Sequence, residues 1–205
     1  MTALIEVSLS WLFKNAKGHD EKSFYTAPAF ADLEGKRDIT VTAPDIGPNS
    51  SVLGVEYTHD GVGKFPSLRW EAPPHIAGQV KEWLLVSEDP DAPLPTPICH
   101  GIYTGIPPTK TSVEAADFEV EDPNEALLKG GFHYGRSRNC LVYIPPRPLM
   151  NHGPHRYFFE VIALKEPLSP NLLSATTTRE QIADAIVDKI LAWGMWVGVA
   201  ERKWE

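Results

Sequence analysis

The sequence predicts a mainly β fold with a helix near each end of the chain. Nineteen prolines and fifteen glycines are spread over 205 residues, enough turn-forming residues to separate many short elements. Several segments rich in β-branched and aromatic residues lie between these turns, and such residues favour strands. No flexible linker or internal repeat divides the chain. We therefore expect a single domain over residues 1–205, with an N-terminal helical extension to about residue 25.

A short amphipathic helix is expected near the N-terminus. Apolar residues recur at near-helical spacing over residues 3–17, and Gly18 suits the end of a helix. These apolar residues are Ile5, Leu9, Leu12 and Phe13. Because the polar face of the helix is not rich in lysine, we expect the apolar face to dock on the protein core and not on a membrane surface.

The expected strands fall into two groups. The short ones cover residues 38–43, 52–57 and 67–72. Two longer runs, 81–89 and 156–164, carry apolar residues on both alternating faces, which is typical of strands buried on two sides. Asp89 ends the first long run and His155 directly precedes the second. Both residues would therefore lie where a core strand meets a loop.

The last part of the chain is expected to form a helix and a closing strand. Two overlapping capping-box patterns begin at Thr177 and Thr178. One helical face then carries apolar residues, and Gly194 suits the end of the helix. These apolar residues are Ile182, Ile186, Ile190 and Trp193. Residues 195–204 would supply the closing strand.

Charge and cysteine content argue against several classes of protein. The formal net charge is −8 and no basic tract is present, which argues against nucleic-acid binding. No apolar run approaches the length of a membrane-spanning helix, so integral membrane association is not expected. The two cysteines do not make a secreted disulfide framework, and the N-terminus lacks a signal-peptide pattern. We therefore expect a cytoplasmic protein.

Three groups of polar residues could form a site. The turn EDPDAP places Asp89 and Asp91 beside two prolines whose rings restrict the backbone. His100 follows nine residues after Asp91. The third group is the block HGPHRY, which contains His152, His155, Arg156 and Tyr157.

Convergence of these groups would create a pocket for an anion. An aspartate that accepts a hydrogen bond from one imidazole nitrogen favours the charged ring and leaves the other nitrogen facing the cavity. Imidazolium, a tyrosine hydroxyl and backbone N–H groups together suit a phosphate, sulfate or carboxylate. An acidic protein could bind an anion locally in this way.

Other chemistries find less support in the sequence. Aspartates and histidines can hold zinc or iron, but no HExxH or other close ligand spacing is present, so we expect no metal and no cofactor. Cys99 and His100 are adjacent and would point to opposite sides of an extended segment, which argues against a catalytic dyad. We expect packed free thiols at Cys99 and Cys140. No GxSxG motif of a serine hydrolase occurs.

Two sequence blocks resemble the signatures of the phosphatidylethanolamine-binding protein family, which includes the Raf kinase inhibitor protein. The first block is DPDAP followed by His100, and the second is GPHRYFFEVIAL. FPSLRWEAPP and VYIPPRP resemble the segments that precede each block, so the resemblance covers roughly residues 35–200. The N-terminal extension looks most like that of fungal members.

The resemblance implies a β-sandwich with a large central antiparallel sheet, a smaller second sheet and peripheral N- and C-terminal helices. It also implies an anion pocket at one end of the large sheet. Carried over by matching position, the ligand-binding residues are Asp89, Asp91, Pro93, His100, Pro146, His155 and Tyr157. His152 and Arg156 are additional candidates, and Arg156 is expected first in a structural ion pair. Family members often carry a cis-proline near this turn, which makes Ala92–Pro93 the bond to inspect.

Three functions are compatible with the resemblance. The first is binding, without catalysis, of a small anionic ligand that carries phosphate or carboxylate; Ile98 and Leu149 add apolar surface that favours an amphipathic one. The second is an enzyme or catalytic partner in fungal secondary-metabolite biosynthesis, which couples acidic, anhydride-like intermediates. His100, His155 and Asp91 would then be the catalytic candidates. The third is a kinase or protease inhibitor that binds a protein partner.

Overall fold

The computed structural model describes residues 3–33 and 37–204, which form two sheets with helices at the periphery. The large sheet has the order β2-β11-β10-β4-β5-β9-β8-β7, and the small sheet has the order β1-β3-β6. The strands of the large sheet are β2 (Ser51–Val52), β4 (Glu82–Asp89), β5 (Ile98–Ile106), β7 (Val120–Asp122), β8 (Leu127–Leu128), β9 (His133–Tyr134), β10 (His155–Leu164) and β11 (Ile190–Ala200). Those of the small sheet are β1 (Thr40–Thr42), β3 (Leu68–Glu71) and β6 (Ser112–Val113).

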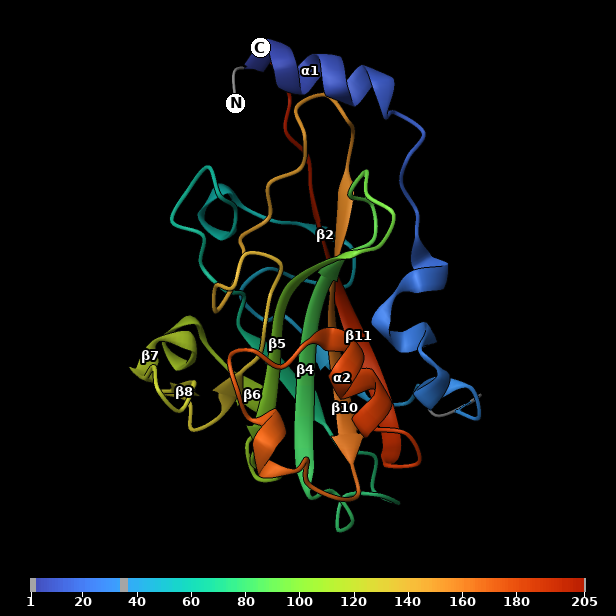
Figure 1. The fold of residues 1–205 in the computed structure, drawn as a ribbon, viewed down its shortest axis with the longest axis vertical. Helices are drawn as coiled ribbons and strands as arrows, with labels where there is room; N and C mark the ends of the chain where they lie inside the picture. Colours follow the sequence, from blue (N-terminus) through green and yellow to red (C-terminus); the bar gives the residue numbers. More distant parts are fainter. Residues whose placement is uncertain (1–2, 34–36, 205) are drawn as a thin grey trace.

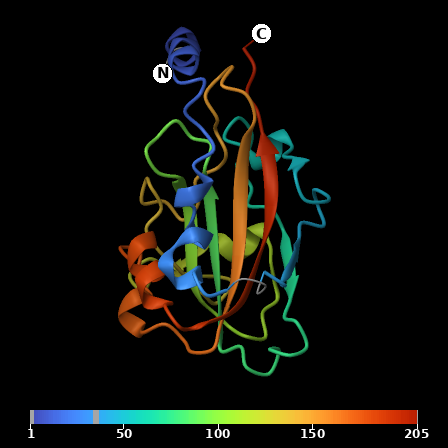
Figure 2. The same ribbon diagram turned by 90° about the vertical axis from the view of Figure 1, so that its right-hand side faces the viewer.

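The helices lie around the large sheet. Helix α1 (Ala3–Leu12) lies across the upper end of the molecule, while β4, β5, β10 and β11 run along its long axis (Figure 1). Helix α2 (Arg179–Ala185) and the short helical turns of residues 20–30 cover one side of this sheet, and β3 lies on the other (Figure 2). The predicted arrangement of a large sheet, a smaller sheet and peripheral helices is confirmed. One edge strand, β2, pairs in parallel with β11, so the large sheet is mixed.

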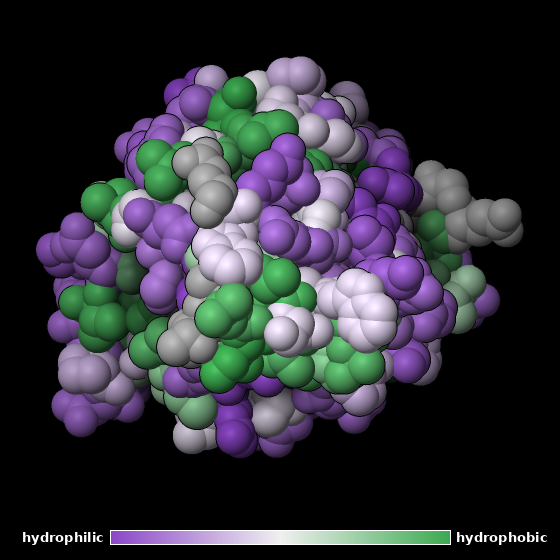
Figure 3. All heavy atoms as spheres, turned by 90° about the horizontal axis from the view of Figure 1, so that it is seen from above, coloured by the Kyte–Doolittle hydropathy of each residue, from purple (hydrophilic) through white to green (hydrophobic). Residues whose placement is uncertain are grey.

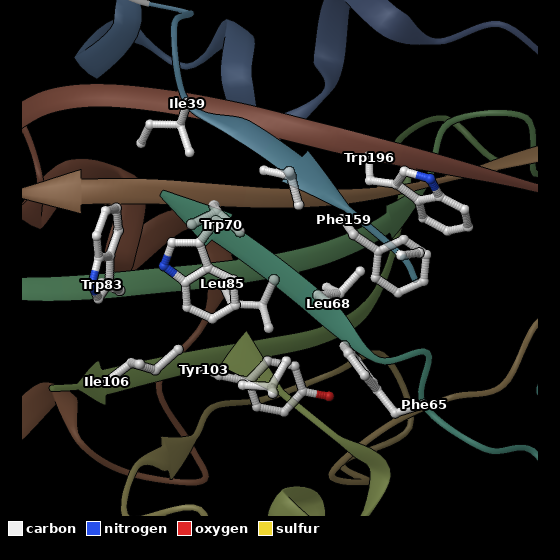
Figure 4. Packing of buried hydrophobic residues seen from close by; sticks show 14 of the residues in the cluster. Ile39, Phe65, Leu68, Trp70, Trp83, Leu85, Tyr103, Ile106, Phe159 and Trp196 are labelled. Carbon is white, nitrogen blue, oxygen red and sulfur yellow. The ribbon is translucent and has the colours of Figure 1, made fainter. Parts of the chain in front are cut away.

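The central strands are buried on both faces, as their apolar runs predict. Trp83 and Leu85 of β4 pack toward the small sheet with Trp70, Phe159 and Trp196 (Figure 4). The alternate residues Leu84 and Val86 pack on the opposite face beneath α2 and the N-terminal turns, with Phe24, Ile162 and Ile182. This alternation follows from the two-residue period of a strand. The alternation thus decides which side chains of β4 and β10 face the small sheet and which face α2.

The C-terminal helix is shorter than predicted. The capping box between Thr178 and Gln181 is present, but α2 ends at Ala185. Ile190 and Trp193 belong to β11, which pairs with β10 along its length. Gly194 lies within this strand, where an added Cβ would lie 1.9 Å from the Ile39 carbonyl oxygen. The glycine is therefore required by a close approach between strands and not by a helix end.

Two strand predictions in the first half also need correction. The predicted strand 52–57 consists of β2 followed by a 3-10 turn at Val55–Tyr57. The long strand β5 was not predicted, because Gly101 and Gly105 interrupt its apolar pattern. All peptide bonds of the described residues are trans, including Ala92–Pro93. No helix within residues 3–33 and 37–204 is long and apolar enough to cross a membrane.

Candidate functional site

The turn after β4 brings the two predicted sequence blocks together, but its two aspartates have different partners. Asp89 Oδ2 accepts a hydrogen bond from His155 Nδ1 at 2.9 Å, and its Oδ1 accepts one from the Asp91 backbone N–H at 2.8 Å. Asp91 Oδ2 instead accepts from the backbone N–H and the Nε of Arg156, both at 2.8 Å. Asp89 is therefore the partner of the histidine, whereas Asp91 orients the arginine.

Arg156 connects the turn to the N-terminal segment. Its guanidinium also donates to both carboxylate oxygens of Asp20, at 2.8 and 2.7 Å, and Asp91 accepts from the Gly18 N–H at 3.0 Å. Burial alone would raise the pKa of Asp91, but the hydrogen bonds from Arg156 outweigh it and lower that pKa. Arg156 thus forms the structural ion pair that the sequence predicted.

His155 and His152 form a hydrogen-bonded chain from Asp89 to the N-terminal segment. The second ring nitrogen of His155, Nε2, lies 2.7 Å from His152 Nδ1. His152 Nε2 lies 3.0 Å from the Phe13 carbonyl oxygen. Together with the bond to Asp89, these contacts form one continuous chain of three hydrogen bonds from Asp89 to Phe13.

His155 and His152 differ in their surroundings. Burial lowers the pKa of His152, which favours its neutral form. The Nδ1–H of His155 donates to Asp89. The expectation that its second nitrogen faces the cavity is wrong, because His152 occupies that nitrogen.

His100 and Tyr157 form a second buried pair, in edge-to-face contact with ring centroids 5.2 Å apart. Burial lowers the pKa of His100, so the ring is neutral near pH 7 and its Nδ1–H donates to the Ile144 carbonyl oxygen. Its Nε2 then carries a lone pair. Burial, followed by the Asp89 charge, raises the pKa of Tyr157 far above its usual range, so the phenol keeps its proton. Within the described part of the chain, neither His100 Nε2 nor the Tyr157 hydroxyl has a hydrogen-bond partner.

A cavity of about 310 Å³, the site cavity, opens beside Asp89 and His155. Its apolar lining residues are Leu9, Phe13, Ala92, Pro93, Leu94, Ile98 and Leu149, and Arg138 and Arg147 complete the wall. Of the seven predicted ligand-binding residues, Asp89, Pro93 and His155 line this cavity. The other four are buried without lining it: Asp91, His100, Pro146 and Tyr157. His100 and Tyr157 therefore lie behind the wall of the site cavity.

Helix α1 covers the site cavity with its polar face inward, which is the reverse of the prediction. Glu6 and Ser10 are buried, whereas Ile5, Trp11 and Leu12 are exposed. Seen from above, hydrophobic atoms gather on the outer surface at this end of the molecule (Figure 3). The prediction that the apolar face docks on the core is therefore wrong; only Leu9 and Phe13 turn toward the cavity.

Two arginines attach α1 to the body of the protein. Glu6 Oε1 accepts from Arg147 at 2.7 Å and Glu6 Oε2 from Arg202 at 2.8 Å. Burial would raise the pKa of Glu6, but hydrogen bonds from both arginines outweigh it and lower that pKa. Glu6, Arg138 and Arg147 were not among the predicted site residues. The one local signal was the spacing of Glu6 and Ser10, which places two polar residues on one helical face.

The structure also bears on the cysteines and on metal binding. Cys99 packs against the core beneath α2, on the side of β5 opposite to the His100–Tyr157 pair, and burial raises its pKa to about 12. The two adjacent residues therefore do not form a dyad. Cys140 is exposed, so the expectation of a packed thiol is wrong there. Among the described residues, no group of three His, Cys, Asp or Glu side chains could hold a metal ion.

The fold is that of a two-sheet β protein with a buried aspartate–histidine cluster at one end of the large sheet. The chain belongs to the phosphatidylethanolamine-binding protein family, whose model matches residues 43–201. The family resemblance of the two blocks is thereby confirmed.

Similar proteins include fungal and bacterial ones. The chain is 43% identical to the phomoidride biosynthesis cluster protein B of Talaromyces stipitatus, over 98% of this chain and 82% of the relative. It is 41% identical to a protein of the same name from a second fungal species, over 98% and 96%. A solved structure of a putative family homologue from Chlamydia trachomatis has a TM-score of 0.66 at 24% identity and covers 81% of this chain and 99% of that one. The last match shows a shared fold.

Proposed function

We propose that the protein binds a small organic acid, with its acidic group placed between His100 and Tyr157. The observation that carries this proposal is the pair of unpartnered buried atoms, His100 Nε2 and the Tyr157 hydroxyl. Buried polar groups are almost always hydrogen-bonded, and leaving one unpaired costs about 1–3 kcal/mol. A ligand that pairs with both atoms would recover this free energy.

The protonation of the two groups selects the chemistry of the ligand. A neutral His100 offers an acceptor and Tyr157 offers a donor. The O–H of a carboxylic acid or of a singly protonated phosphate can donate to His100, and its second oxygen can accept from Tyr157. A carboxylate therefore binds together with one proton. The apolar lining of the site cavity favours a carbon-rich remainder of the molecule.

A role in the biosynthesis of a small molecule is the second candidate function. The two fungal relatives bear the name of a biosynthesis cluster and match 98% of this chain. The hydrogen-bonded chain from Asp89 through His155 to His152 lies beside the cavity, which is a suitable arrangement for general acid or base chemistry. On this proposal the pocket would orient an acidic intermediate for reaction.

Tyr157→Phe is expected to weaken the binding of decanoate about tenfold, because one hydrogen bond to the acidic group is lost. The thermal midpoint should stay constant or rise slightly, since the lost hydroxyl has no partner in the described residues. Isothermal titration calorimetry and a thermal melt measure the two quantities.

Tyr103→Phe is the matched control. The Tyr103 hydroxyl is buried and donates to the Val142 carbonyl oxygen at 2.9 Å, so its removal should lower stability and leave decanoate affinity unchanged. Equal decanoate affinity in Tyr157→Phe and the wild type would contradict the proposed placement of the acidic group.

A further inference from the structure

A second hollow lies next to the site cavity. This front hollow has a volume of about 450 Å³ and lies between the loop of residues 94–99, the segment 136–138 and the start of α2. Leu94, Ile98 and Arg138 line both spaces. The two hollows therefore adjoin across one wall made of two apolar side chains and one guanidinium.

The front hollow contains arginines without counter-ions. Within the described residues, the side chains of Arg136 and Arg138 have no ion pair and no hydrogen bond. The third arginine of the hollow, Arg179, is paired with Glu88 at 3.1 Å and lies 3.8 Å from Glu180, which accounts for the acidic group in the lining. The free positive charge of the hollow thus comes from Arg136 and Arg138.

Hydrogen bonds hold the backbone of the segment that carries these two arginines. The Arg136 N–H donates to the Thr177 carbonyl oxygen at 2.8 Å, and the Arg138 N–H donates to that of Cys99 at 3.1 Å. Between them, the buried Ser137 hydroxyl donates to the Leu141 carbonyl oxygen at 2.7 Å and accepts from the Leu141 N–H at 3.0 Å. The side chains of Arg136 and Arg138 are exposed, and their two guanidinium groups can both reach an anion placed in the hollow.

We infer that the protein binds an elongated molecule with an acidic group at each end and an apolar middle. This inference rests on the proposed function, which places one acidic group at His100 and Tyr157. The second group binds Arg136 and Arg138 in the front hollow, and the carbon chain crosses over Leu94 and Ile98. Bidentate contacts between guanidinium and carboxylate or phosphate suit this second position. In a protein of net charge −8, such a local pair of arginines supplies the selectivity for a dianion.

The test compares straight-chain dicarboxylates of increasing length with monocarboxylates of the same carbon number, by isothermal titration calorimetry. Decanedioate and decanoate are the reference pair. We expect the best-fitting dicarboxylate to bind wild-type protein at least about fivefold more tightly than its monocarboxylate, as a partly exposed ion pair allows. Arg136→Gln should abolish this preference and leave decanoate affinity unchanged, because Arg136 lines the front hollow and does not line the site cavity.

Arg69→Gln is the matched control, since Arg69 is an exposed arginine of β3 on the small sheet. It should retain the full preference for the dicarboxylate. A series in which no dicarboxylate binds more tightly than its monocarboxylate would overturn the inference, as would a preference that survives Arg136→Gln. Neither outcome would change the expected weakening of decanoate binding by Tyr157→Phe. Loss of that effect, by contrast, would overturn the proposed function itself.

Discussion

Replacing Glu160 by glutamine is expected to stabilise the protein by an amount that grows as the pH rises. Glu160 is fully buried on β10 beside Glu88, and this burial, together with the Glu88 charge, raises its pKa well above the usual value of 4.5. Glu88 is itself fixed as an acceptor of the Phe24 N–H at 2.7 Å and of Arg179 Nε at 3.1 Å. Glu160 therefore remains protonated in the folded protein, and within the described residues its two carboxyl oxygens have no hydrogen-bond partner.

The sign of the effect follows from proton binding. Above pH 4.5 the unfolded chain has released the Glu160 proton while the folded protein retains it, so the free energy of unfolding falls by about 1.4 kcal/mol per pH unit. This decline ends at the raised pKa of the folded state. Glutamine has nearly the same shape as the protonated acid and is uncharged at every pH. The variant should thus match the wild type below pH 4.5 and exceed it increasingly above.

Urea denaturation at a series of pH values measures this difference. Glu166→Gln is the control, because Glu166 is exposed after β10 and should change stability by less than about 0.5 kcal/mol at any pH. Parallel stability curves for Glu160→Gln and the wild type would show that Glu160 is ionised in the folded protein and contradict the assignment.

Asp89→Asn is expected to cost about 2–3 kcal/mol of stability, as a buried hydrogen bond to a charged group does. Asp89 accepts on both oxygens, from His155 and from the Asp91 N–H, while an asparagine can accept on only one. Its NH₂ group would then face one of these donors. The lost charge also weakens the hydrogen bond from His155 with which the chain toward His152 and Phe13 begins.

The comparison variant is Asp60→Asn, which removes the carboxylate of an exposed ion pair with Arg202. Exposed ion pairs contribute little, so this variant should stay within about 1 kcal/mol of the wild type in urea denaturation. If Asp89→Asn were equally mild, the chain from Asp89 to Phe13 would not contribute to folding as the structure indicates.

The sequence predicts an element well when its side chains fit either a strand pattern or a helical pattern, but not both. β4 and β10 carry apolar residues on both faces, and the prediction of their positions is correct to within one residue. The segment from Ile182 to Trp193 fits a helical face, yet its second half pairs with β10, since a partner strand distant in sequence decides the outcome. β5 was missed for the same reason: its glycines weaken the local pattern while β4 supplies the pairing.

The sequence indicated several residues of the site, but it did not indicate most of the contacts between them. The approach of Asp89 to His155 follows from their positions at the ends of two core strands that neighbour each other in the sheet. The pairing of His155 with His152 and the cover formed by α1 depend on Phe13 and Glu6, more than a hundred residues distant in the chain. The spacing of Glu6 and Ser10 shows that α1 has a polar face, but no local pattern shows that this face meets Arg147 and Arg202.

The most direct test of the central claim is the number of protons bound together with decanoate. Calorimetric titrations at pH 7, in two buffers of different ionisation enthalpy, measure this number. Because burial keeps His100 neutral in the free protein, the complex should take up close to one proton, and the affinity should fall by about tenfold per pH unit above neutrality. Decanoate binding with no proton uptake and an affinity independent of pH would contradict the pairing of the acidic group with His100 and Tyr157.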